Sequence, residues 1–227
     1  MNVLILTGSP KGRKSASCML GSKLAEGLRE HGAAVSDGMV HGGLRSEEGT
    51  CRLLDSVDAS DLVVFAFPVY VDSLPAPLTR LLERIAERRA RGTCAGTPRL
   101  AVIVQCGFPE SHQCDTAVDI CRLFAERTGM RWSGALAMGM GGSVGEDFRK
   151  MPGGGRNILD ALGMASKSLA NGDDIPREAT TLFAKPLMPR WMYTLVGNLG
   201  WRMQMRKNKA RRPLAHRPYS QEQGHAP

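Results

Sequence analysis

Short apolar runs alternate with amphipathic stretches through roughly the first 170 residues of the chain. The strongest runs, at 2–7, 61–67 and 99–105, contain few polar residues, and weaker runs of the same length lie at 33–40 and 132–138. A strand that is apolar throughout must be covered on both faces of its sheet. These runs therefore predict buried, parallel strands.

Between the runs, apolar residues recur at helical spacing. Leu20, Leu24 and Leu28 predict a helix over about 15–31. Similar patterns predict helices at about 75–91, 111–128 and 157–169. Strands that alternate with helices predict a doubly wound α/β fold with right-handed crossovers. In such a fold the ligand lies outside the carboxyl ends of the strands, which directs attention to the loops after the first, third and fourth strands.

The hydrophobic content and the distribution of charge exclude some classes of protein. The chain has 227 residues, of which 42% are hydrophobic, and this excludes disorder of the whole chain. The net charge is +8, but residues 202–227 hold seven basic residues and one acidic residue. The rest of the chain is therefore nearly neutral, and nucleic-acid binding across the whole fold is not expected. We expect a domain over residues 1–172 and a basic extension over residues 173–227.

The chain offers no run of 18 uncharged apolar residues, so no transmembrane helix is expected. Its first apolar run has no charged leader and is too short for a signal peptide, so a cytoplasmic protein is expected. None of the six cysteines forms a C-x-x-C pair. We expect reduced cysteines that act as small buried hydrophobes, and no metal site.

The loop after the first strand, residues 8–17, holds three serines and three cations and then opens a helix. Free N–H groups at a helix start bind anions, and hydroxyls add donors. The glycine spacing fits neither the nucleotide P-loop nor the dinucleotide fingerprint, which favours a single phosphate monoester. The alternative is a helix that is merely capped by Ser15 or Ser17.

The loop after the third strand reads Pro68-Val69-Tyr70-Val71-Asp72-Ser73, followed by Pro75 and Pro77 at the start of a helix. Here the chain resembles the NAD(P)H-dependent FMN reductases and related flavodoxin-like flavoproteins. In that family a P-x-Y segment after the third strand lies against the flavin ring, and a Gly-Ser-Pro-Lys loop like residues 8–11 holds the phosphate. The resemblance covers about residues 1–170.

The resemblance implies a flavodoxin-like three-layer sandwich with a five-stranded parallel sheet of order 2-1-3-4-5. It also implies bound FMN, with NADH or NADPH as electron donor and a small acceptor such as a quinone or a flavin. No catalytic side chain is expected, because the flavin itself carries the hydride chemistry. The relatives commonly form homodimers, so a homodimer is expected as well.

The expected FMN-binding residues come from the three loops. Tyr70 offers an aromatic face to the ring, Gly107 permits close backbone approach, and Phe108 can cover the ring. The full set is Ser9, Lys11, Lys14, Ser15, Ala16, Ser17, Pro68, Val69, Tyr70, Val71, Asp72, Ser73, Gln105, Gly107 and Phe108. Two alternatives stay open: an FMN electron carrier of flavodoxin type, and a non-enzymatic binding module that acts through its basic tail.

The extension carries its own pattern. Two of the three tryptophans, Trp191 and Trp201, lie in a Met-rich stretch over 188–205 with apolar residues near helical spacing and arginines at its ends. This predicts a helix that packs on its own domain or on a dimer mate, or one that contacts a membrane surface or another protein.

Overall fold

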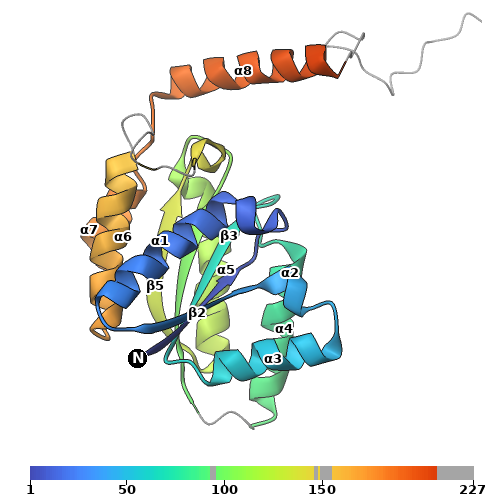
Figure 1. Ribbon diagram of the computed structural model, residues 1–227, viewed down its shortest axis with the longest axis vertical. Coiled ribbons are helices and arrows are strands. Elements are labelled where there is room, and N and C mark those ends of the chain that lie inside the picture. Colours follow the sequence, from blue (N-terminus) through green and yellow to red (C-terminus); the bar gives the residue numbers. More distant parts are fainter. Residues whose placement is uncertain (93–95, 146–147, 149–154, 209–227) are drawn as a thin grey trace, which may run out of the picture. The chain divides into compact units, whose positions relative to one another are not determined.

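The computed structural model describes residues 1–92, 96–145, 148 and 155–208. Five strands form one parallel sheet in the order β2-β1-β3-β4-β5 (Figure 1). Their bounds are β1 Asn2–Thr7, β2 Ala34–Met39, β3 Leu62–Pro68, β4 Arg99–Gln105 and β5 Arg131–Met138. All seven residues of β3 are buried, because this strand lies at the centre of the sheet and is covered on both faces. The predicted strand order is confirmed.

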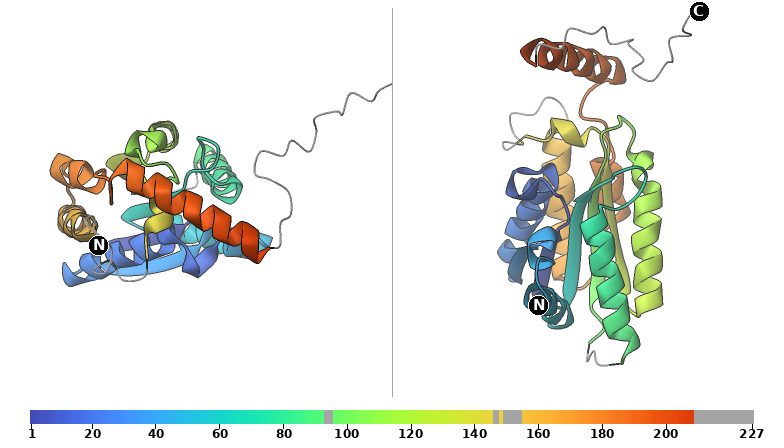
Figure 2. Two further views of the ribbon diagram at one scale, coloured as in Figure 1. Left: turned by 90° about the horizontal axis from the view of Figure 1, so that it is seen from above. Right: turned by 90° about the vertical axis from the view of Figure 1, so that its right-hand side faces the viewer.

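Helices cover both faces of the sheet and complete three layers (Figure 2, right). One face carries α1 (Ala16–Glu30) and α6 (Gly155–Ala170), with α7 (Arg177–Phe183) packed on α6 and β5. The other carries α3 (Glu47–Asp58), α4 (Ala76–Ala90) and α5 (Asp115–Thr128), with the short α2 (Val40–Gly43) between β2 and α3. Three single turns of 3-10 helix complete the described elements: η1 (Gly12–Lys14), η2 (Ser111–Cys114) and η3 (Gly141–Ser143).

Helix α3 was not among the predicted helices, although Thr50, Leu54 and Val57 form a buried face at helical spacing. Its start also has a clear local cause, because the side chain of Ser46 accepts a hydrogen bond from the amide of Gly49 at 3.0 Å. Glu47 and Glu48 then place negative charge in the first turn, where it favours the helix dipole. The cap residue and the spacing of the buried residues both identify this helix.

The compact unit extends from Met1 to Pro189, beyond the boundary expected at residue 172. Helix α7 belongs to it, since Ala179 and Phe183 are buried and Thr180 Oγ1 donates to the carbonyl of Ala135 at 3.2 Å. The amide of Ile175 also donates to the carbonyl of Ser133 at 2.8 Å, which ties this segment to β5.

The second unit comprises Arg190–Pro227, and its described part is a single helix, α8 (Arg190–Lys207), with no buried residue. The predicted C-terminal helix is therefore present. The basic residues from Lys209 onward lie outside the described residues, as does Cys94. None of the described helices is long and apolar enough to cross a membrane.

Candidate functional site

A cavity of about 290 Å³ opens at the carboxyl ends of the strands. It is lined by all three loops that the sequence singled out, together with a fourth segment that follows β5. Ten of the expected residues line it: Ser9, Lys11, Lys14, Ser15, Ala16, Pro68, Val69, Tyr70, Gln105 and Gly107. Met19, Cys106, Gly141, Gly142 and Val144 also line it. The remaining expected residues, Ser17, Val71, Asp72, Ser73 and Phe108, lie in the same loops but not in the cavity wall.

The first loop is held by its own backbone. The amide of Gly8 donates to the carbonyl of Ala66 at 2.9 Å, which fixes the end of β1 against β3. Ser15 caps α1, because its Oγ accepts from the amide of Cys18 at 3.1 Å and donates to the carbonyl of Gly12 at 2.7 Å. The capping residue is thus Ser15, and the side chain of Ser17 takes no part in capping the helix.

Ser17 presents an unpaired hydroxyl. Its side-chain oxygen is buried and has no hydrogen-bond partner in the described part of the chain, and the residue is 1% exposed. A buried hydroxyl without a partner carries a desolvation cost. The amides of Ala16 and Ser17 lie in the first turn of α1, before the helix can satisfy its own donors. Two amides and one hydroxyl at a helix start are the donor set that a phosphate requires.

Cationic side chains stand at the same end of the cavity. Lys11 and Lys14 line it, and both are exposed. Ser9 is buried, and its Oγ is 3.4 Å from the amide of Lys11, so its hydroxyl proton is not used in that contact. The hydroxyl of Ser9 and the two ammonium groups add to the positive potential of the helix start.

The second loop forms a tight turn with an unusual backbone. The amide of Tyr70 donates to the carbonyl of Ser73 at 2.9 Å, and the amide of Ser73 donates back to the carbonyl of Tyr70 at 3.1 Å. The two central residues, Val71 and Asp72, have φ values of 50° and 57°. A β-branched residue at positive φ is strained. The amide of Ser73 is used within the turn, whereas the amides of Val71 and Asp72 have no backbone acceptor among the described residues.

The turn presents Tyr70 to the cavity. Its side chain lines the wall and stays 43% exposed, as expected of an aromatic face that a planar ring would cover. Val71, at the tip of the turn, is 97% exposed. Asp72 is also exposed.

The third loop leaves open space. A methyl group at Gly107 would meet no atom within 4 Å, so the cavity continues to the backbone itself. Phe108 is 58% exposed and does not line the cavity. The expected role of Phe108 as a cover for the ring therefore stays a prediction.

The segment after β5 completes the cavity and was missed as a lining element, although its glycine run was a weak signal. The amide of Gly141 donates to the carbonyl of Cys106 at 2.8 Å, and that of Met140 donates to the carbonyl of Phe108 at 2.6 Å. A Cβ at Gly141 would overlap the side chain of Gln105, and a Cβ at Gly139 would overlap the carbonyl of Pro109. The glycines allow this segment to lie directly against the third loop.

A thiol pair lies at the edge of the cavity. Cys106 lines the wall and Cys114 is fully buried at the end of η2. Hydrogen bonding to the Cys114 thiol lowers the pKa of Cys106 to about 7, against a smaller opposing effect of burial. The same hydrogen bond, together with burial, raises the pKa of Cys114. The pair therefore favours a thiolate at Cys106, the member that faces the cavity.

Taken together, the first loop lines the cavity with hydroxyl and ammonium groups, and the second and third loops line it with an aromatic side chain and open backbone. Among the described residues no group of three or more His, Cys, Asp or Glu side chains is placed to hold a metal ion. The arrangement fits a ligand with one phosphate and a planar ring, which FMN carries at the two ends of its ribityl chain.

Known proteins share this architecture. A family model described as flavodoxin-like fold matches residues 1–147. Solved structures with the same fold include an azoreductase from Bacillus anthracis str. Sterne, with 16% identity, a TM-score of 0.50, and coverage of 76% of this chain and 99% of that one. An NAD(P)H:quinone oxidoreductase from Methanothermobacter marburgensis is 17% identical, with a TM-score of 0.53 and coverage of 74% and 96%.

A third solved structure contains a ligand. It is an FMN-dependent NADH-azoreductase from Bacillus anthracis str. Ames Ancestor in complex with FMN, which is 11% identical, with a TM-score of 0.52 and coverage of 76% of this chain and 99% of that one. At these identities the likeness establishes the fold. No curated protein sequence matches the chain.

Proposed function

Because the chain belongs to the family of flavodoxin-like fold, we propose that it binds FMN in the cavity and passes electrons from NADH or NADPH to a small acceptor. The acceptor class is a quinone, a flavin or a similar compound. The observation that carries the proposal is the unpaired, buried hydroxyl of Ser17 in the first turn of α1, next to Ala16, which lines the cavity. This donor has no structural task in the described residues, and a phosphate would satisfy it.

The first loop would hold the phosphate. The amides of Ala16 and Ser17 and the hydroxyls of Ser9 and Ser17 donate, while Lys14 adds charge. Every donor except Lys14 is fixed by the backbone or by burial, so little conformational entropy is lost when the anion binds.

The second and third loops would hold the ring. Tyr70 stacks on one face, the amides of Val71 and Asp72 donate to the polar edge of the ring, and the open space at Gly107 admits the ring close to the backbone. Cys106 lies in the same wall, where its thiolate character adds negative charge.

When bound, FMN supplies the hydride chemistry. The protein's residues bind and orient it, exclude water from one side of the ring, and leave the other side open to a donor and an acceptor. Electron transfer of this kind requires no acid/base pair from the protein. The three solved relatives act on azo compounds or quinones by their titles, which supports a small, electron-poor acceptor for this chain.

Titration of the apoprotein with FMN tests the proposal directly. We expect tight binding with a flavin spectrum, and bleaching of that spectrum when NADH or NADPH is added anaerobically. Ser17→Ala is expected to weaken FMN binding roughly tenfold through the lost charge-assisted hydrogen bond. Ser22→Ala, an exposed position on the same helix, serves as the matched control. A protein that cannot be reconstituted with FMN would overturn the proposal.

The second candidate is an electron carrier that binds FMN but is not reduced by nicotinamides. The nearly neutral charge of the chain before residue 202 speaks against it, because carriers of the flavodoxin kind usually have an acidic surface. Normal FMN binding without bleaching by either nicotinamide would favour the carrier. The expected homodimer stays a prediction, which sedimentation of the holoprotein checks.

A further inference from the structure

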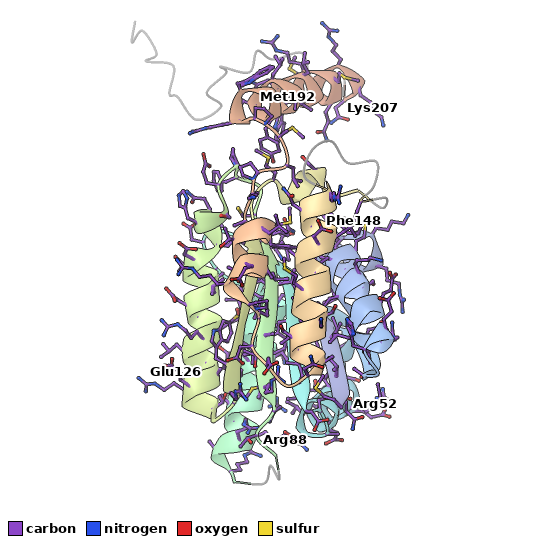
Figure 3. All side chains as sticks on the ribbon, turned by 90° about the vertical axis from the view of Figure 1, so that its left-hand side faces the viewer. Arg52, Arg88, Glu126, Phe148, Met192 and Lys207 are labelled. Carbon is purple, nitrogen blue, oxygen red and sulfur yellow. The ribbon has the colours of Figure 1, made fainter. Side chains whose placement is uncertain are left out.

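Helix α8 exposes apolar side chains that its own unit does not bury. It spans 18 residues, Arg190–Lys207, and none of them is buried. Trp191, Trp201 and Met203 are each about 70% exposed, and Leu195, Val196 and Leu199 are at least half exposed. Figure 3 shows side chains projecting from all sides of this helix, between the labelled Met192 and Lys207. An exposed apolar surface of this kind marks a place where the chain meets an apolar phase or partner.

The aliphatic residues of α8 share one face. Met192, Leu195, Val196, Leu199 and Met203 recur at spacings of three and four residues. Such spacing places them along one stripe of the helix. Arg206 and Lys207 continue the stripe at the C-terminal end of the helix, Trp191 lies beside it, and Arg190 and Trp201 lie on the opposite face. The helix therefore has one aliphatic face with aromatic and basic residues around it.

The charge of the segment identifies its partner. Between Glu178 and Glu222 the sequence has no acidic residue and nine Lys and Arg residues, four of them on α8 itself. A second copy of this helix would bring cations against cations. A nucleic acid would match the charge but would leave the aliphatic stripe exposed. An anionic lipid surface matches both, because its headgroups attract the cations and its acyl chains receive the apolar side chains.

We propose that α8 binds in the plane of an anionic lipid bilayer, with its aliphatic stripe in the acyl boundary and its arginine and lysine side chains reaching to the headgroups. Trp191, which flanks the stripe, suits this depth, since amphipathic rings prefer the interface between acyl chains and water. Since no described helix is long and apolar enough to cross the membrane, the contact is peripheral. It does not depend on the proposed flavin chemistry.

The chain carries its own probe for this contact. It has three tryptophans, and only Trp132 lies outside α8. In the full-length Trp132→Phe variant, fluorescence therefore reports on α8 alone. We expect a blue shift on addition of vesicles that contain phosphatidylglycerol, and no shift with vesicles of phosphatidylcholine alone. Added salt should reverse the shift, because it screens the attraction to the headgroups.

Variants separate the contributions of charge and apolar surface. Arg202→Gln with Arg206→Gln should lower partitioning onto the anionic vesicles roughly thirtyfold, because each cation near an anionic surface contributes about 1 kcal/mol to binding. Leu195→Gln with Leu199→Gln should also lower it at least tenfold. The matched control is Arg80→Gln with Arg127→Gln, which removes the same charge from exposed positions in the first unit. It should partition within twofold of the unchanged protein.

Three outcomes would overturn the proposal. The first is an absence of vesicle binding by the full-length protein, and the second is equal binding to both vesicle types. The third is a blue shift that grows with protein concentration without lipid, which would show that a second copy covers the stripe. Far-UV circular dichroism of each variant confirms that the fold is retained, so that a loss of binding is not a loss of structure.

Discussion

Cys106 and Cys114 lie together at the edge of the cavity. A shared partner brings them together, since the amide of Cys106 and the thiol of Cys114 both donate to the carbonyl of Met138, at 3.1 and 3.6 Å. The end of β5 thus positions a thiol from the third loop against a thiol from η2.

This contact predicts the pH dependence of alkylation at Cys106. Only the thiolate reacts, and the lowered pKa means that iodoacetamide should react faster as pH rises through about 7 and level off above it. Cys114→Ala removes the principal cause of the lowered pKa, so the midpoint should move upward. Mass spectrometry of the labelled peptides gives the rates. Cys51, exposed on α3, is the internal control, and an unchanged midpoint in the variant would contradict the assignment.

FMN should protect Cys106 from the same reagent. Cys106 lines the cavity, so a ligand that fills the cavity blocks access to its sulfur. Cys51 should be labelled equally with and without FMN. Equal labelling of Cys106 in both states would mean that the ligand binds elsewhere.

Gly107→Ala should separate binding from folding. The added methyl group meets no protein atom within 4 Å, so the free energy of unfolding of the apoprotein should change by less than about 1 kcal/mol. The same methyl group enters the space proposed for the ring, and FMN affinity should fall at least tenfold. Chemical denaturation and FMN titration of one preparation measure the two effects. A variant that binds FMN normally would remove Gly107 from the site.

Two glycines after β5 should differ sharply in their tolerance of a side chain. Gly139→Ala places a methyl group against the carbonyl of Pro109, and a backbone atom cannot move away cheaply. We expect it to lower the free energy of unfolding by about 2 kcal/mol or more. Gly142→Ala meets nothing within 4 Å and should be nearly neutral. Thermal denaturation of the pair decides this, and equal melting temperatures would argue against the close approach of these loops.

The turn after β3 should gain stability when its strain is released. Val71 has a φ of 50°, which glycine adopts freely. Val71→Gly should raise the free energy of unfolding by about 1 kcal/mol, the relief of strain less the added freedom of the unfolded chain. Asp72→Gly should gain less, because aspartate tolerates this conformation better than valine does. A destabilised Val71→Gly variant would contradict the assigned turn.

The strands and most of the helices could be predicted because burial on two faces produces uninterrupted apolar runs, as in β3. Helix α3 was not predicted, although the Ser46 cap and the helical spacing of Thr50, Leu54 and Val57 both indicate it. The compact unit also extends past residue 172, because α7 is held by hydrogen bonds from Ile175 and Thr180 to β5. Pairing of this kind between distant segments leaves no mark on local composition.

The cavity shows the same division. Ten lining residues could be named from the sequence because parallel strands bring their carboxyl ends together. The choice between Ser15 and Ser17 as the cap needed the structure, since both are serines at the same helix start. The left-handed pair at Val71 and Asp72 was unexpected, because neither is a glycine or an asparagine. The wall at Gly141 and Gly142 was missed, because a glycine run carries no period.

The buried hydroxyl of Ser17 also links ligand binding to melting temperature. In the ligand-free protein an unpaired hydroxyl costs about 1–3 kcal/mol, and an anion that accepts its proton removes that cost. Ser17→Ala should therefore raise the melting temperature of the ligand-free protein and reduce the further rise that the ligand causes. The same substitution would then stabilise the ligand-free protein and destabilise the ligand-bound protein. The start of α1 therefore reaches its full stability only when a bound anion supplies the hydrogen-bond acceptor that the protein lacks there.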